Sequence, residues 1–505
     1  MKHEVAAPSL SKSALSGVAW NYAGIAVLVV AQIASTAATA RLIGIKGFGS
    51  YAAAQAAIQL GGYFSLQTLG LAVMRRKELG SKTVGTALTI SAIAAIVTLV
   101  LFWFGADLWG EAWNNHSSAV LVRVMAFSLF FTSLASVPIA LVRRRLRFGA
   151  AAIAETGSQV GGMTLSVVLA VLLHSATALA IGQVFAGVTL FISVVALARE
   201  DLRFGFDGAE GRDYLTYSSQ VSSIYLGSYF INTLPFLFVS RVFGKFTLGL
   251  YSRTYMIVSI PLSYLSTSVT KVLFPLYARV RDDIARTRML LSEGLTLATG
   301  FTWPAFALVG GAATVVVDTL LGSRWQQGIP FLRLSALIVA GLFPTGLLTN
   351  AAEALRWIRF AILRQVVLLA LLVTTIVVVK INHLSTADLL FGVAITQWIT
   401  YAIMLRTFVR REVIDSRLVL RGHLVHALVS AGAFGLAFVC ARLLAPAGTV
   451  AQVAGEVVVV VLVGGVILTG RSWYPATQIL ARRLHTAFPA GSPWITRLRL
   501  EPLEG

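Results

Sequence analysis

Apolar runs of about twenty residues, separated by short polar connections, dominate this sequence. A helix of about 20 apolar residues spans the hydrocarbon core of a bilayer. Strands of a transmembrane β-barrel alternate polar and apolar residues instead, so runs of this length exclude that architecture. Only 12% of the residues are charged, against about 25% in an average soluble protein. The chain is therefore predicted to be an all-α integral membrane protein.

The apolar runs predict fourteen transmembrane helices with short connections and no extramembrane domain. The seventh and eighth runs are the most polar of the set. The expected spans are residues 16–40, 49–73, 83–106, 119–142, 149–173, 177–198, 215–240, 251–277, 290–317, 330–353, 359–380, 386–406, 424–445 and 449–469.

The lysines and arginines are distributed very unevenly between the two sets of connections. The formal net charge is +20, and thirty of the 41 lysines and arginines lie in the termini and the alternate connections that share their side. The opposite connections hold seven. By the positive-inside rule, both termini are expected in the cytoplasm. The excess of positive charge is thus explained by the cytoplasmic connections of a membrane protein, and no nucleic-acid partner is expected.

A motif of the form R-x-x-G-x-x-x-x-G-x-Y occurs twice, with an offset of 200 residues. Each copy falls between consecutive predicted spans, in a tight turn on the side opposite the termini. Six spans separate the copies, so the two halves of a duplicated chain would have the same orientation, with the substrate between them. We assign the motif a structural role, since glycine permits close packing and unusual backbone angles. Its residues are Arg41, Gly44, Gly49 and Tyr51, then Arg241, Gly244, Gly249 and Tyr251.

The repeat divides the chain into four segments. Residues 1–200 form an N-terminal lobe of six spans, and residues 201–408 form a C-terminal lobe of six. Residues 409–470 add two helices outside the repeat, and residues 471–505 form a basic cytoplasmic tail.

Polar side chains recur on one face of spans one, two, seven and eight. Lipid penalises such faces, so they line either a water-filled cleft or contacts between helices. Arg253 and Lys271 lie five helical turns apart on one face, about 27 Å along the axis. Because that face has no acid, the two cations indicate a cleft that binds an anionic group such as a diphosphate. The predicted binding residues are Arg253, Lys271, Asn21, Gln32, Gln55, Gln59, Tyr225, Tyr229, Asn232 and Tyr264.

Two acids are candidates for coupling transport to a H⁺ or Na⁺ gradient. Glu155 lies near a cytoplasmic helix end, and Glu456 lies deeper, in the last span. Pairing with a neighbouring helix is the alternative for both. No other cofactor and no metal site is expected.

The repeat is accompanied by further short segments, in order, at residues 138–148, 180–183 and 321–333, and by the stretch from Leu248 to Pro275. Together these segments resemble the polysaccharide-transport branch of the MOP exporter superfamily, the Wzx-like flippases of lipid-linked oligosaccharides. The resemblance implies a V of two six-helix lobes around a central cationic cavity in the bacterial inner membrane. Pro275 ends the stretch that begins at Leu248, and the resemblance assigns it a structural role like that of the motif residues.

The resemblance also implies a function. Undecaprenyl-diphosphate-linked repeat units would move from the cytoplasmic to the periplasmic leaflet by alternating access, for exopolysaccharide, capsule or O-antigen synthesis. The expected partners are the lipid-linked oligosaccharide, membrane lipids, a polysaccharide polymerase and a chain-length regulator. Members often carry an acid beside the position of Asn232, whereas Thr233 follows here, which leaves ion coupling through that helix open.

Three other functions are alternatives for a chain of this composition. A multidrug antiporter of the same superfamily usually needs a buried carboxylate in span one or seven, and neither span contains one. A lipid II flippase would share the fold and differ only in substrate. An enzyme of the same pathway would place acids or bases on long external loops, whereas the loops here are short and have no Cys/His cluster.

Overall fold

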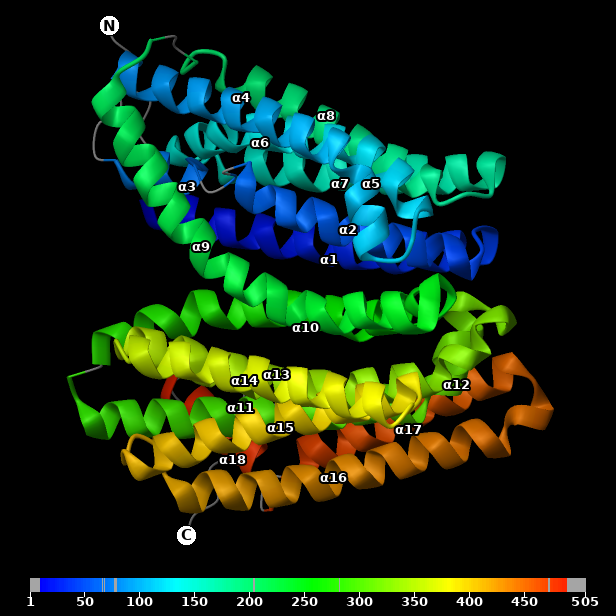
Figure 1. The fold of residues 1–505 in the computed structure, drawn as a ribbon. Coiled ribbons are helices and arrows are strands. Elements are labelled where there is room, and N and C mark those ends of the chain that lie inside the picture. Colours follow the sequence, from blue (N-terminus) through cyan, green and yellow to red (C-terminus); the bar gives the residue numbers. More distant parts are fainter. Residues whose placement is uncertain are drawn as a thin grey trace, which may run out of the picture. The chain divides into compact units, whose positions relative to one another are not determined.

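The computed structural model describes residues 10–487 except 66, 68, 77–79, 203–204, 281 and 471–472. Within these residues all regular structure is helical, and no strand is present. The chain forms two compact units, Met1–Arg253 and Thr254–Gly505, which divide within one long helix. Figure 1 shows the helices of each unit.

Unit 1, Met1–Arg253, is a bundle of long helices joined by short turns. Helix α7 packs against α8 and α1, and α6 packs against α8, α4 and α2. Figure 1 shows α9 running obliquely across the other helices of this unit. The elements are α1 (Leu10–Leu42), α2 (Ile45–Phe64), α3 (Leu69–Arg75), α4 (Ser81–Phe104), α5 (Ala106–Ala112), α6 (Ser117–Arg144), α7 (Phe148–Leu173), α8 (Thr177–Ala198), α9 (Gly208–Phe238), a π-helical turn at Val239–Phe243 and the first part of α10 (Gly244–Val280).

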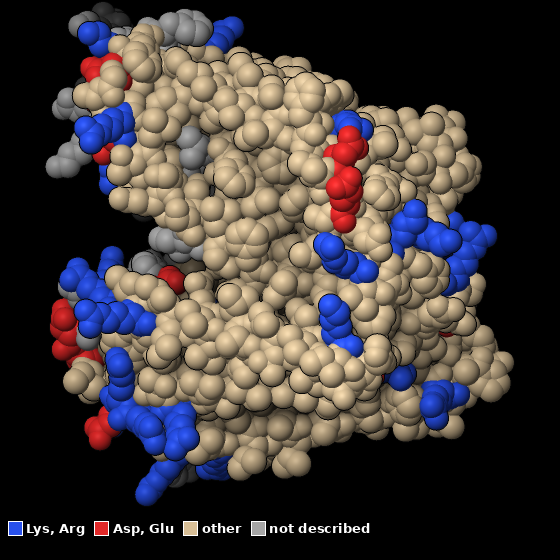
Figure 2. Space-filling view, viewed as in Figure 1, with Lys and Arg blue, Asp and Glu red and all other residues tan. Residues whose placement is uncertain are grey.

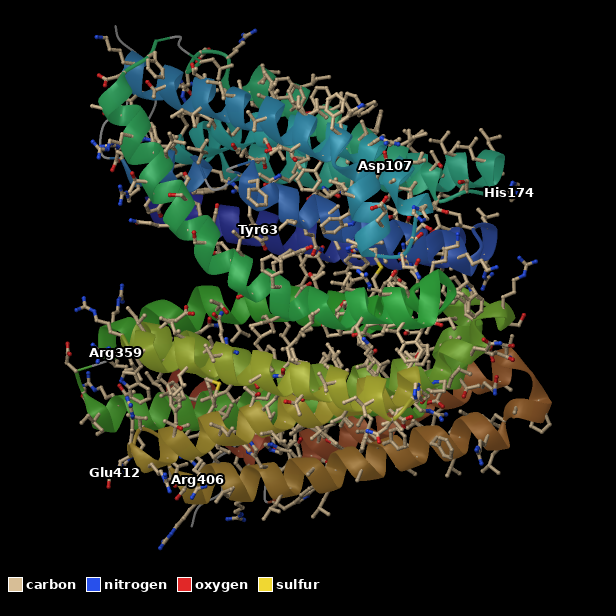
Figure 3. All side chains as sticks on the ribbon, viewed as in Figure 1. Tyr63, Asp107, His174, Arg359, Arg406 and Glu412 are labelled. Atoms are coloured by element: carbon tan, nitrogen blue, oxygen red, sulfur yellow. The ribbon has the colours of Figure 1, made fainter. Side chains whose placement is uncertain are left out.

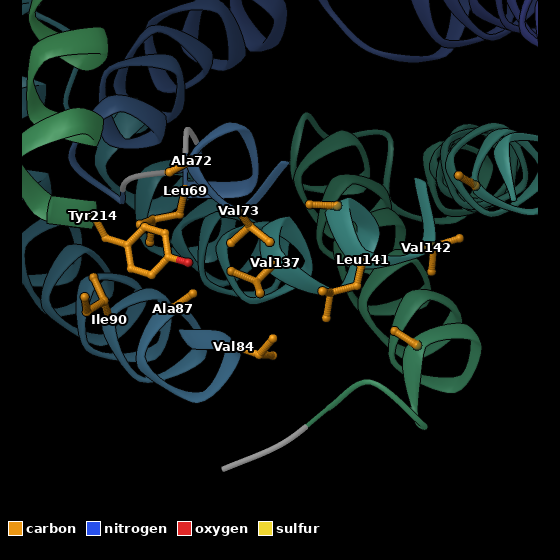
Figure 4. Packing of buried hydrophobic residues seen from close by; sticks show 13 residues of the cluster. Leu69, Ala72, Val73, Val84, Ala87, Ile90, Val137, Leu141, Val142 and Tyr214 are labelled. Carbon is orange, nitrogen blue, oxygen red and sulfur yellow. The ribbon is translucent and has the colours of Figure 1, made fainter. Parts of the chain in front are cut away.

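A core of small and aliphatic side chains joins α3, α4 and α6 with the first turns of α9. Val73, Val137 and Leu141 are buried at its centre, and the Tyr214 ring from α9 closes one side (Figure 4). Such residues pack closely because each buried methylene adds contact with its neighbours. The beginning of α9 is thereby fixed on unit 1.

Unit 2, Thr254–Gly505, continues α10 and adds the remaining helices. Helix α11 packs against α16 and α13, and α13 packs against α15. The elements are α11 (Ile284–Gly311), α12 (Ala313–Val316), a π-helical turn at Val317–Leu321, a 3₁₀ turn at Ser323–Gly328, α13 (Ile329–Ala354), α14 (Ile358–Ile381), α15 (Thr386–Arg410), α16 (Ser416–Leu443), a 3₁₀ turn at Ala445–Ala447, α17 (Thr449–Thr469) and α18 (Pro475–Ala487).

Each of the fourteen predicted spans overlaps one long helix of the structure. Eleven helical segments in the described part of the chain are long and apolar enough to cross a membrane, or twelve if α11 and the helix bent 71° from it count as one. Figure 2 shows the charged side chains gathered towards the helix ends, with a broad uncharged band between them. The chain is thus an all-α, multi-pass membrane protein, and the count of fourteen crossings stays a prediction.

The predicted span 49–73 is interrupted in the structure. Helix α2 ends at Phe64, and α3 begins at Leu69. The Ser65 amide and hydroxyl donate hydrogen bonds to the carbonyls of Gly61 and Gly62, at 2.8 and 3.1 Å. These bonds satisfy the carbonyls of Gly61 and Gly62 in the last turn of α2, where Ser65 is the C-cap residue.

The start of the expected tail is a helix that packs on unit 2. Helix α18 lies against α11 and α16. The Arg483 guanidinium lies 2.6 Å from the Glu293 carboxylate, and the Tyr474 hydroxyl donates to the Gly300 carbonyl. In Figure 3, Arg359, Arg406 and Glu412 lie together at one end of this unit, as expected for connections that share one side of the membrane.

Candidate functional site

The two copies of the repeated motif form the turns between α1 and α2 and between α9 and α10. In the first copy, Gly44 precedes α2 with an ordinary φ of −68°. In the second copy, Gly244 has a φ of +81°, a conformation that favours glycine. The same motif thus makes two turns of different backbone geometry.

The second glycines of the two copies meet inside unit 1, where α2 and α10 touch backbone to backbone. A Cβ on Gly49 would lie 1.8 Å from the Lys245 carbonyl oxygen, and a Cβ on Gly249 would lie 2.1 Å from that of Ile45. Residues 45 and 245 are themselves related by the offset of 200, so the contact is reciprocal. Only glycine permits an approach this close.

Arg253 lies one turn beyond this contact on α10. Its side chain is buried, with 6% exposed, and its guanidinium carbon lies 4.0 Å from the centre of the Phe48 ring and 5.5 Å from that of Tyr51. Stacking on aromatic faces is a favourable setting for a guanidinium, which is more weakly hydrated than an ammonium. In this conformation the cation joins α10 to α2.

Helices α2 and α9 carry five further predicted residues of unit 1 and pack together. Tyr229 is buried, and its hydroxyl donates a 2.9 Å hydrogen bond to the Ala56 carbonyl of α2. Gln59, Tyr225 and Asn232 are exposed. The structure therefore brings five predicted residues, Gln55, Gln59, Tyr225, Tyr229 and Asn232, onto one pair of helices.

Tyr63, which is not among the residues predicted from the sequence, belongs to this group. Its ring stacks on that of Tyr225, with ring centres 6.0 Å apart and planes inclined by 13°. Tyr229 meets Tyr63 edge-on at 6.2 Å. Figure 3 shows Tyr63 on α2 beside α9. Tyr63 lies four residues after Gln59, so both residues are on one face of α2. This spacing is the sequence signal that could have identified Tyr63.

The first turns of α9 are tied by ion pairs to Arg75 at the end of α3 and to Arg76 directly after it. The Arg76 guanidinium lies 2.6 Å from the Glu210 carboxylate and 2.7 Å from that of Asp213. Arg75 lies 3.5 Å from Asp213 and over the Tyr217 ring. These side chains are between one quarter and just over one half exposed, so water screens the pairs.

The other predicted residues belong to helices α1 and α10. Gln32 is half-buried on α1, which packs on α7, and Tyr264 is half-buried on the part of α10 that belongs to unit 2. Asn21, Lys271 and Pro275 lie outside the residues whose side chains the structure describes. The predicted pairing of Arg253 with Lys271 therefore stays a prediction.

The two candidate acids have different surroundings. The Glu155 carboxylate of α7 lies 2.6 Å from the Arg143 guanidinium of α6. Glu456 is buried on α17, with 9% exposed, and its Oε1 has no hydrogen-bond partner among the described residues. The described residues hold no group of three or more His, Cys, Asp or Glu side chains arranged to bind a metal ion.

Residues 38–330 match the model of a family described as polysaccharide biosynthesis protein. The lipopolysaccharide biosynthesis protein WzxC of Escherichia coli (strain K12) is 24% identical over 336 residues, which are 66% of this chain and 68% of that protein. The succinoglycan biosynthesis transport protein ExoT of Rhizobium meliloti (strain 1021) is 24% identical over 311 residues, 60% of this chain and 62% of that protein.

Two solved structures share the fold. The lipid II flippase MurJ, in an inward closed conformation, superposes with a TM-score of 0.69 at 10% identity, covering 90% of this chain and 99% of the other. The MATE transporter VcmN of Vibrio cholerae gives a TM-score of 0.55 at 13% identity, covering 80% and 97%. The chain thus shares its fold with these two proteins.

Proposed function

Because the chain belongs to the polysaccharide biosynthesis protein family, we propose that it is a flippase of the MOP exporter type for lipid-linked oligosaccharides. The substrate is an undecaprenyl-diphosphate-linked repeat unit, which moves from the cytoplasmic to the periplasmic leaflet of the bacterial inner membrane. Both termini lie in the cytoplasm. The names of WzxC and ExoT, which refer to lipopolysaccharide and succinoglycan biosynthesis, support this substrate class.

The observation that carries the proposal is the polar surface of α9. Thr216, Ser219, Gln220 and Ser223 lie at helical spacing on one face of this helix, and all four are exposed. Exposure of so many polar groups to lipid would be unfavourable, so this face contacts water or a polar substrate. A saccharide is a ligand that such a face accommodates, because hydroxyl and amide groups both donate and accept hydrogen bonds.

Transport proceeds by alternating access in this proposal. The diphosphate contacts Arg253 and Lys271, the saccharide contacts the polar face, and the polyprenyl chain stays in lipid. Arg253 is covered by Phe48 in the present conformation. Its contact with the diphosphate therefore requires α2 and α10 to separate. Coupling to H⁺ or Na⁺ through Glu155 or Glu456 is part of the same proposal, as are a polymerase and a chain-length regulator as partners.

The experiment that tests the proposal combines the substitutions Arg253→Gln and Lys271→Gln in cells that depend on this chain for polymer export. Export is expected to stop while the variant stays in the membrane and remains folded, although loss of the stack on Phe48 lowers its thermal stability. Arg324→Gln, which removes an exposed cation elsewhere in unit 2, is the matched control and should leave export unchanged. Normal export by the double variant would contradict the assignment of the two cations.

Depletion of the chain separates this substrate from lipid II. Loss of surface polymer with normal cell-wall growth supports the proposed substrate class. Arrest of cell-wall growth would instead indicate lipid II.

A further inference from the structure

The tyrosines around the stacked pair of Tyr63 and Tyr225 differ in how far they are buried. On one side, Tyr229 is 5% exposed and bonded to the Ala56 carbonyl, so it packs α9 against α2. On the other side, Tyr225 is 48% exposed. A ring that served only to pack the helices would be covered like Tyr229. The exposed ring requires a different explanation.

The surroundings of the exposed ring are polar and carry no acid. Gln59 lies one helical turn before Tyr63, and Asn232 lies two turns after Tyr225, and both are exposed. No Asp or Glu occurs in residues 45–64 or 214–238. A cationic ligand would need such an acid in this low-dielectric setting, because an isolated charge is costly there.

We propose that Tyr63 and Tyr225 form a platform on which a sugar ring of the substrate stacks, with Gln59 and Asn232 as hydrogen-bond partners for its hydroxyls. This inference rests on the proposed function and adds a saccharide subsite to it. A pyranose has an apolar C–H face and a polar hydroxyl rim. The tyrosine ring contacts the apolar C–H face, while the amide side chains donate hydrogen bonds to the sugar hydroxyls and accept hydrogen bonds from them.

The neighbouring contacts hold the platform before the substrate arrives. The Tyr229 hydrogen bond and its edge-on contact with Tyr63 fix α9 against α2 at this level. The stacked arrangement of Tyr63 and Tyr225 limits the rotation of both rings. Preorganised rings lose little conformational entropy on binding, which raises the affinity for a weakly held sugar.

The test measures binding of two lipids to the full chain in nanodiscs. One is undecaprenyl-diphosphate-linked saccharide extracted from the bacterium that carries the gene, and the other is sugar-free undecaprenyl diphosphate. The ratio of the two dissociation constants reports the contribution of the sugar. Tyr225→Ala is expected to reduce the preference for the glycosylated lipid about fivefold to tenfold, the effect of losing one aromatic stack. The affinity for the sugar-free lipid should stay unchanged.

Two further variants complete the test. Tyr225→Trp keeps a stacking face and should retain the preference. Phe104→Ala removes an aromatic ring that is 76% exposed elsewhere in unit 1, and it should also retain the preference. An unchanged ratio in folded Tyr225→Ala would overturn the platform. Equal binding of both lipids by the wild type would overturn the platform alone, whereas binding of neither would overturn the proposed function as well.

Discussion

Gly49 and Gly249 approach each other reciprocally, so that a Cβ on either would lie 3.1 Å from the backbone nitrogen of the other. The two residues occupy the same position in the two copies of the repeated motif. A sequence duplication has thus become a contact between α2 and α10 in which each copy packs on the other. Substitution of either glycine therefore tests the structural role of the repeated motif.

The first prediction concerns these glycines. Gly49→Ala and Gly249→Ala should each destabilise the protein by about 1–3 kcal/mol, the usual cost of overpacking a close contact. Thermal unfolding of the purified protein in detergent measures this. Gly44→Ala is the matched control, because a Cβ there meets nothing within 4 Å and φ is −68°. Equal melting of Gly49→Ala and Gly44→Ala would contradict the proposed packing role.

The second prediction concerns Arg253 on the Phe48 ring. Arg253→Lys keeps the charge but loses the planar group, so the stability should fall by about 0.5–2 kcal/mol. Phe48→Leu should lower the stability too, and Arg253→Lys should add little to it, because both changes remove the same stack. A double-mutant cycle by thermal unfolding measures the coupling. Wild-type stability of Arg253→Lys would show that charge alone matters at this position.

The third prediction concerns the ion pairs between α3 and α9. Glu210→Gln should weaken the start of α9 more than Asp213→Asn, because the Glu210 side chain is 27% exposed and that of Asp213 is 46% exposed. Each effect should stay below about 1 kcal/mol and shrink in high salt, as for other partly exposed pairs. Hydrogen exchange of the first turns of α9 reports the change. Faster exchange that does not depend on salt would argue against an electrostatic anchor.

The fourth prediction concerns the docking of α18. Gly300→Ala would place a Cβ 2.4 Å from that of Ala476, so α18 should separate from α11 and become sensitive to protease. Gly432→Ala on α16, where a Cβ meets nothing within 4 Å, should leave cleavage unchanged. Limited proteolysis of the reconstituted protein distinguishes the two variants. Protection of α18 in Gly300→Ala would mean that other contacts hold the helix.

The positions of the long helices could be predicted because the membrane imposes a length of apolar sequence on each. The interruption after Phe64 could not, since it falls inside the single apolar run of residues 49–73, where hydropathy gives no sign of a break. The docking of α18 was equally hidden, because it depends on the fit of Ala476 against Gly300. Local patterns reveal which segments are helical, whereas contacts between distant segments decide where they end and pack.

The candidate site was predictable to a similar extent. Polar residues at helical spacing identified α2 and α9, and the structure places Gln59, Tyr225 and Tyr229 on that helix pair. Tyr63 could not be identified in the same way, because a single tyrosine at the end of an apolar run gives no sign of its stacking partner on another helix. Nor did the sequence reveal that Arg253 is covered by Phe48, since a long-range contact leaves no local pattern.

The most direct test of the account is a translocation assay with the purified full chain in sealed proteoliposomes. Undecaprenyl-diphosphate-linked saccharide is incorporated in both leaflets, and a membrane-impermeant lectin reports the outer pool. We predict that the wild type exposes the inner-leaflet pool to the lectin, and that the variant combining Arg253→Gln and Lys271→Gln, folded and reconstituted equally, does not. An inner-leaflet pool that stays protected with the wild type would contradict the proposed flippase.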